Sequence, residues 1–113
     1  MAKVVWTGPA LIDVDDIFRY LARASQSADV AARICDEIIQ FAQDFLERLP
    51  SGGALVEQGR DFGAREIYKH GYRLIYVRRG EHCYIVRCIH SSRDIARELH
   101  PADWPLNWNP EDN

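Results

Sequence analysis

Apolar positions repeat with a helical period through the first half of the chain. One set, at steps of three and four residues, predicts a helix from the Gly8-Pro9 break through about Ala24. A second, longer set predicts a helix that Ser27 caps and Pro50 ends. The two sets are Leu11, Val14, Ile17 and Leu21, followed by Ala31, Ile34, Ile38, Phe41, Phe45 and Leu49. Since only a short turn separates them, we expect an αα-hairpin in which each helix buries one apolar face.

The second half of the chain is rich in β-branched and aromatic residues, which predicts strands. Three runs at residues 65–70, 72–79 and 83–90 are separated by His70-Gly71 and by Arg79-Gly80-Glu81, sequences typical of hairpin turns. We therefore expect an antiparallel meander. Apolar residues occupy both faces of its last two strands, which indicates that helices cover one face and that the other is partly used.

The remaining segments complete the predicted order of elements. Lys3–Thr7 predicts a first strand, residues 50–63 a glycine-rich loop, and residues 91–100 a short helical piece. Residues 101–113 predict an irregular C-terminal tail without clear periodicity. The predicted fold class is α+β, in the order β-α-α-β-β-β, with an antiparallel sheet packed against a two-helix hairpin. A chain of 113 residues fits one such domain, which we expect at residues 1–100.

Charge is divided unevenly along the chain, although the net charge is only −3. Residues 1–59 carry five basic and nine acidic side chains, a net of −4, and residues 60–100 carry nine basic and five acidic, a net of +4. This asymmetry indicates a polyanion or an acidic protein as partner; arginines on a solvated sheet face are the alternative. Asp13, Asp15 and Asp16 lie early in the first predicted helix, where carboxylates interact favourably with the positive helix end.

The sequence contains no pattern typical of a metal or cofactor site. Cys35, Cys83 and Cys88 lack the spacing of a zinc ligand pair, and their odd number argues against a disulfide framework. We therefore expect small buried side chains in a reducing cytoplasm, with no metal and no cofactor. No apolar stretch is long enough to cross a membrane, and the first residues lack the pattern of a signal peptide.

Several short motifs occur in one order along residues 3–99. They are Asp16-Ile17-Phe18-Arg19-Tyr20-Leu21, Leu49-Pro50-x-Gly52, Arg65-Glu66-Ile67-x(4)-Tyr72-Arg73-Leu74-Ile75-Tyr76, and Tyr84-Ile85-Val86-Arg87-Cys88-Ile89-His90 followed by Arg93-Asp94. In this order and spacing they resemble the RelE/ParE superfamily of toxins from type II toxin–antitoxin pairs. The ending Ile89-His90-x-x-Arg93-Asp94-x(4)-Leu99 is most similar to the ParE branch.

The resemblance implies a function and partners. ParE-like toxins are known for poisoning DNA gyrase, which implies binding to the gyrase–DNA intermediate without catalytic turnover by the chain itself. The partners implied are gyrase and a cognate antitoxin, whose C-terminal segment wraps the helical hairpin and sheet in a toxin–antitoxin hetero-oligomer. One alternative is a RelE-like ribosome-dependent mRNA endonuclease, with the ribosome and mRNA as targets. A second alternative is an inert module that only binds the antitoxin.

The endonuclease alternative departs from its branch at several positions. That branch uses lysines on the strand before the Tyr-Arg motif, where this chain has Glu66 and Tyr68 between Arg65 and Lys69. No tyrosine follows Tyr84, so a histidine would have to act near the C-terminus. A pI near 5.7 also gives only a local cationic field. If the chain were an RNase, the catalytic residues implied would be Arg73, His90 and Arg93.

Three groups of residues are the candidate contacts. The target-binding candidates are Arg65, Lys69, Arg73, Arg87, Arg93 and Arg97, and they act together only if the strand register places them on one face. The antitoxin-binding candidates are Leu11, Val14, Phe18, Phe41 and Phe45. Structural alternatives stay open: an ion pair of Arg73 with Glu66, pairing of Arg93 and Arg97 with Asp94 or Glu98, and a hydrogen-bonded, partly buried His90.

Overall fold

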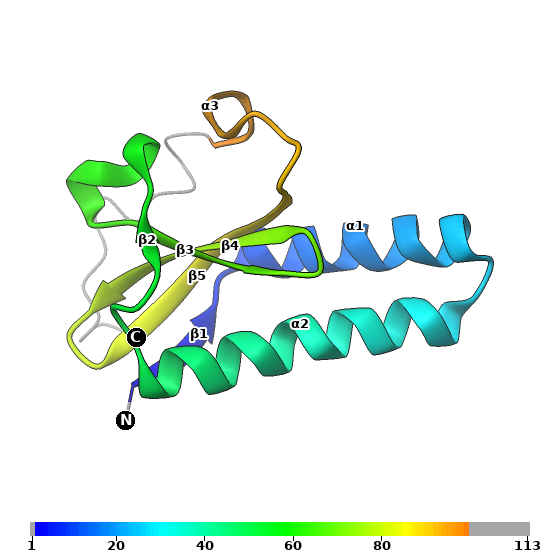
Figure 1. The fold of residues 1–113 in the computed structure, drawn as a ribbon, viewed down its shortest axis with the longest axis horizontal. Helices are drawn as coiled ribbons and strands as arrows, with labels where there is room; N and C mark the ends of the chain where they lie inside the picture. The colour runs from blue at the N-terminus through cyan, green and yellow to red at the C-terminus, as the bar shows by residue number, and fades with distance from the viewer. Residues whose placement is uncertain (1, 100–113) are drawn as a thin grey trace.

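The computed structural model describes residues 2–99, which form a helical hairpin, a five-stranded sheet and two short helices (Figure 1). The elements are β1 (Lys3–Trp6), α1 (Gly8–Ser25), α2 (Ala28–Arg48), β2 (Ala54–Leu55), the 3-10 helix η1 (Glu57–Phe62), β3 (Arg65–Lys69), β4 (Tyr72–Arg79), β5 (His82–His90) and α3 (Ile95–Glu98). The predicted hairpin, first strand, meander and short C-terminal helical piece are confirmed. The predicted tail at residues 101–113 lies outside the described residues.

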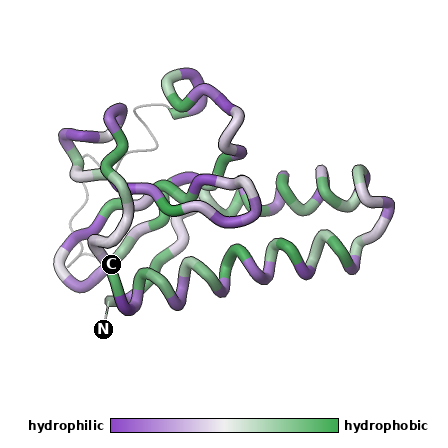
Figure 2. The backbone as a smooth tube through the Cα atoms, viewed as in Figure 1, coloured by the Kyte–Doolittle hydropathy of each residue, from purple (hydrophilic) through white to green (hydrophobic). Residues whose placement is uncertain are grey.

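Local signals fix the ends of the two long helices. The hydroxyl of Ser27 accepts a hydrogen bond from the Val30 backbone N–H at 3.2 Å, as expected of a helix cap. Pro9 occupies the first turn of α1, where a missing N–H costs nothing. Gln26 adopts a left-handed conformation with φ of 56° and ends α1. In Figure 2, hydrophobic and hydrophilic residues alternate turn by turn along α2.

The sheet is mixed, whereas the sequence analysis expected an antiparallel one. Its strand order is β1-β5-β4-β3-β2, and the meander of β3, β4 and β5 is antiparallel as predicted. The strand β1 lies beside β5 and runs parallel to it, from Lys3 opposite His82 to Trp6 opposite Ile85. The difference arises because the hairpin and the meander separate β1 from β5 along the chain, so no tight turn forces them to be antiparallel.

The segment at residues 50–63, predicted as a glycine-rich loop, also contains a short strand and a 3-10 helix. Ala54 and Leu55 add a two-residue strand to the edge of β3, and η1 follows directly. Val56 is 3% exposed and packs with Ile75 and Val77, so this segment covers part of the sheet. The segment is therefore held by contacts to residues distant in the chain, which local sequence patterns do not report.

Two apolar cores lie on the two faces of the sheet. The hairpin covers one face, where Ile38 and Leu46 of α2 pack with Tyr76 and Ile85. On the other face, η1 and α3 lie opposite α2 (Figure 1), and Ile95 packs with the residues of the smaller core. Each strand residue of the meander therefore belongs either to the hairpin face or to what we call the second face.

Candidate interaction surfaces

The strand register separates the basic residues that the sequence analysis grouped together. Arg65 and Lys69 lie opposite Tyr76 and Tyr72, which belong to the core under the hairpin, so both basic residues lie on the hairpin face. Arg73 lies opposite Tyr68 and Ile89 and therefore points to the second face. The sheet therefore does not bring Arg65, Lys69 and Arg73 together on one face, as the target-binding prediction required.

Arg73 takes part in a compensated cluster on the second face. Its Nη1 lies 3.7 Å from Oε2 of Glu66, and its Nη2 donates to the carbonyl of Ser91 at 3.3 Å. The Tyr68 hydroxyl donates to Glu66, and the Arg73 guanidinium lies 5.7 Å from the Tyr68 ring centroid. The hydrogen bond to Glu66 raises the pKa of Tyr68. The Arg73–Glu66 ion pair is thus confirmed, and the carboxylate neutralises the cation on this face.

Arg87 is part of a nearly buried ion pair rather than an exposed contact. Its Nε donates to Asp13 at 2.7 Å, its Nη1 donates to the Glu98 carbonyl at 2.6 Å, and the two paired side chains are 13% and 11% exposed. Asp13 also accepts the backbone N–H of Cys88 at 2.8 Å. The pair therefore ties α1 and the end of α3 to β5. The expectation that Asp13 acts through the helix dipole is incomplete, because no acidic residue lies in the first turn of α1.

The two remaining arginine candidates lie in the C-terminal segment and are paired there. Arg93 lies 3.1 Å from Glu98, and Arg97 lies 3.9 Å from Asp94. These are the pairings that the sequence analysis left open as alternatives, and both occur. Both arginines are highly exposed, at 64% and 88% of the side chain, so they can still exchange these partners for others.

A cleft of about 780 Å³ lies between α1, the end of β5 and the segment before α3. It brings His90 together with Arg93, but Arg73 does not line it. His90 is exposed, and its Nδ1 accepts the Ser92 backbone N–H at 3.1 Å, which leaves the ring proton of the neutral form on Nε2. Its ring meets Tyr72 edge to face at 5.3 Å. His90 is hydrogen-bonded as expected, but it is more exposed than expected.

The apolar antitoxin-binding candidates divide between an exposed and a partly buried set. Leu11 is 55% exposed. Val14, Phe18, Phe41 and Phe45 pack against the main core and remain partly exposed. Phe41 and Phe45 lie 5.7 Å apart, and the Lys69 ammonium lies 5.3 Å from the Phe41 ring.

Residues 2–99 contain neither a candidate metal-binding cluster nor a candidate membrane-spanning helix. No group of three or more histidine, cysteine or acidic side chains is placed to hold a metal ion there. No helix in this range is long and apolar enough to cross a membrane. All three cysteines are buried and free, and burial raises the pKa of the Cys88 thiol to about 12.

A family model described as the ParE toxin of type II toxin–antitoxin systems matches residues 4–95. The chain belongs to this family. A solved structure described as the chromosomal ParDE toxin–antitoxin system from P. aeruginosa has the same fold, with a TM-score of 0.65 and 19% identity. The alignment covers 80% of this chain and 96% of that chain. A search of curated proteins found no match.

Proposed function

We propose that this ParE family member inhibits DNA gyrase in the cytoplasm and is neutralised by a cognate antitoxin. The observation that carries the proposal is the family match over residues 4–95, which spans both long helices and all of the sheet except Lys3. Gyrase inhibition is typical of ParE toxins. The mechanism is stoichiometric: the toxin binds the gyrase–DNA intermediate and blocks religation without turnover.

The geometry supports this reading over the endonuclease. An RNase of the RelE kind needs a base, a cation for the developing phosphate charge and an acid around one phosphate. Arg73 lies opposite Ile89, next to His90 along β5, but it points to the second face, is paired with Glu66 and does not line the cleft that His90 and Arg93 line. A carboxylate beside the cation repels a phosphate, so this arrangement does not favour in-line cleavage of RNA.

A cleavage assay with purified gyrase and plasmid DNA tests the proposal. The toxin is expected to inhibit supercoiling and to trap cleaved DNA, and equimolar antitoxin is expected to reverse both effects. Codon-specific cleavage of ribosome-bound mRNA without any effect on gyrase would instead establish the endonuclease. Tight antitoxin binding with neither activity would establish the inert module.

A matched pair of variants tests the predicted target contact at Arg93. Arg93→Ala removes a 64% exposed cation paired with Glu98, and Arg19→Ala removes a 69% exposed cation paired with Asp15. Both changes remove one charge from a surface ion pair, so their effects on stability should be similarly small. We expect only Arg93→Ala to weaken gyrase inhibition. Equal inhibition by the two variants would remove Arg93 from the target-binding surface.

A further inference from the structure

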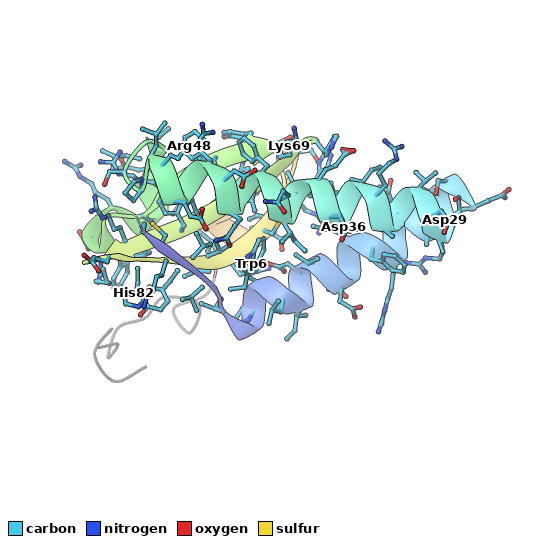
Figure 3. The ribbon with its side chains drawn as sticks, turned by 90° about the horizontal axis from the view of Figure 1, so that it is seen from below. Trp6, Asp29, Asp36, Arg48, Lys69 and His82 are labelled. Carbon is cyan, nitrogen blue, oxygen red and sulfur yellow. The ribbon has the colours of Figure 1, made fainter. Side chains whose placement is uncertain are left out.

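The outward side of α1 is exposed from Leu11 to Ala24. Its exposed side chains occur as neighbouring pairs at steps of four residues, and side chains at this spacing form continuous rows on a helix. The opposite side of the helix, which includes the buried Ile17, packs against the main core. Figure 3 shows α2 along one side of α1 and, among the described elements, no helix or strand along the other side. We call the exposed rows the α1 stripe; it consists of Leu11, Ile12, Asp15, Asp16, Arg19, Tyr20, Arg23 and Ala24.

The α1 stripe changes its chemical character with each turn of the helix. From the N-terminal end, its four layers are Leu11 with Ile12, Asp15 with Asp16, Arg19 with Tyr20, and Arg23 with Ala24. The first layer is apolar, although its two side chains are 55% and 64% exposed, and Tyr20 is 59% exposed. The second layer is acidic, and the third and fourth layers each carry one arginine. Exposed apolar side chains that lie next to charges of both signs indicate an interaction surface.

The charges of the α1 stripe are available to an outside partner. Asp15 and Arg19 form an ion pair at 3.0 Å, but their side chains are 57% and 69% exposed. Such a pair contributes little to stability, so either charge can exchange its partner for another. Asp16 and Arg23 are exposed and have no ion-pair partner within residues 2–99. The stripe therefore offers two acidic and two basic groups at separate positions along one helix.

We propose that the α1 stripe is the contact surface between two copies of this chain, related by a two-fold axis with their α1 helices antiparallel. If the axis passes midway between residues 17 and 18, the acidic layer of each copy faces the third layer of the other. Asp16 then pairs with Arg19 of the second copy, and Asp15 accepts a hydrogen bond from Tyr20 of the second copy. The apolar layer covers the fourth layer of the other copy, which consists of an alanine and the aliphatic stem of an arginine. The axis repeats every contact, and no layer faces a layer of the same charge.

The dimensions of the α1 stripe fit a contact between two helices. Its rows follow the four-residue ridges of α1, and packing of such ridges gives a crossing angle of about 50°, the commonest class of helix packing. The stripe is about 20 Å long, because a helix rises about 1.5 Å per residue. A single pair of helices is a small interface, so we expect a dissociation constant of about 10–100 µM. The chain is therefore monomeric in dilute assays.

A second copy complements the stripe better than a partner of one charge sign. An acidic segment or a nucleic acid would lie beside Asp15 and Asp16, and a basic segment would lie beside Arg19 and Arg23, with like charges in contact in both cases. A partner that presents the four layers in the opposite order avoids this repulsion, and an antiparallel copy of α1 has that order. The antitoxin-binding candidate Leu11 thereby becomes a candidate for the contact between toxin copies.

Sedimentation equilibrium of the purified full chain, at concentrations from about 1 to 300 µM, tests the proposal. Asp15→Lys/Asp16→Lys makes the charged layers of the stripe all basic. Arg19→Glu/Arg23→Glu makes the same layers all acidic. Neither variant can pair with itself, but the two together form one basic and one acidic stripe. Thermal melting of each variant verifies that it is folded.

Glu57→Lys/Asp61→Lys is the matched control for the basic variant. Glu57 belongs to an exposed ion pair with Arg60, and Asp61 is exposed without an ion pair among the described residues, as Asp15 and Asp16 are on α1. Both double variants replace two carboxylates by lysines, so both change the net charge from −3 to +1. The control residues lie in η1, on the face of the sheet opposite the hairpin (Figure 1). The control therefore separates the position of the charges from their total.

We expect the average mass of the unmodified chain and of the control to rise from 13.0 kDa toward twice that value with concentration. Each stripe variant should associate at least about tenfold more weakly, because an exposed charge contact contributes about threefold and the axis doubles each contact. An equimolar mixture of the two stripe variants should form a heterodimer that added salt weakens. A purely structural role for these side chains would not produce this rescue.

Three results would overturn the proposal. One is an unmodified chain that stays at 13.0 kDa throughout the concentration range. Another is self-association of either stripe variant that equals that of the control. The third is a mixture of the two folded variants that stays monomeric. A monomeric unmodified chain, with antitoxin binding lost in both stripe variants, would assign the stripe to the antitoxin instead.

Discussion

Replacement of Asp13 by alanine should destabilise the fold strongly, because it removes one partner of the nearly buried Asp13–Arg87 ion pair. Its carboxylate accepts Arg87 Nε at 2.7 Å, Arg87 Nη2 at 3.1 Å and the Cys88 backbone N–H at 2.8 Å. Removing one partner of a buried pair leaves the other charge uncompensated, at a cost of about 3–5 kcal/mol. A domain of this size is stable by about 5–15 kcal/mol, so the variant loses a large share of its stability.

Urea denaturation followed by circular dichroism measures the effect. The midpoint should fall by about 2 M, since the urea slope of small domains is about 1–3 kcal/mol per molar. Asp13→Asn, which retains an acceptor for the Cys88 N–H, should fall between the alanine variant and the unmodified chain. Asp15→Ala is the control, because its pair with Arg19 is 57% and 69% exposed and contributes about 0.5 kcal/mol. A loss below about 1 kcal/mol for Asp13→Ala at an unchanged slope would refute the reasoning.

Three further predictions follow from single positions. Gly53→Ala should lower the thermal melting temperature, because the added Cβ would lie 2.9 Å from the Tyr76 hydroxyl, and fluorescence melts measure this. Cys88, with its thiol pKa raised to about 12 by burial, should resist iodoacetamide at pH 8 until the protein unfolds, as mass spectrometry of pulse-labelled protein would report. Hydrogen bonding to His70 lowers the pKa of Glu37. The stability that the Glu37 carboxylate contributes is therefore present above its ordinary pKa of 4.5 and is lost as the pH falls through the lowered pKa. Urea denaturation at a series of pH values should show the stabilities of Glu37→Gln and of the unmodified chain converging in acid.

The sequence predicts the elements of this fold well where periodicity is long. Stripes of four and six apolar residues define α1 and α2, and hairpin turn residues separate β3, β4 and β5. A two-residue strand such as β2 has no period to detect, and η1 is held by contacts of Val56 and Phe62 with the second core. These elements depend on tertiary contacts, which local propensity does not encode.

The candidate site was predicted less well, because its side chains depend on pairing across the sheet. The position of Arg73 beside Glu66 follows from the hairpin turn at His70-Gly71, which the sequence predicts, and the ion pair was therefore among the predicted alternatives. Arg48 and Arg78, in contrast, donate to a backbone carbonyl and to the Ser51 hydroxyl, and no sequence pattern predicts these partners. Whether a cation is compensated depends on which carboxylates the fold brings within 4 Å, and helix ends and strand ends carry no motif for that.

Arg87 illustrates how one residue of register changes the role of a side chain. The ladder between β4 and β5 shifts between Ile75 and Tyr76: Ile75 lies opposite Arg87, but Tyr76 lies opposite Ile85. Val86 is therefore the extra residue of a bulge, and strict alternation along β5 fails at this point. Because β1 ends opposite Ile85, the edge of β5 beyond it is open to α1, and Asp13 takes both the Arg87 guanidinium and the Cys88 N–H there. The open edge of β5 thus gives Arg87 a partner on α1, and the residue fastens α1 to the sheet instead of forming a surface contact.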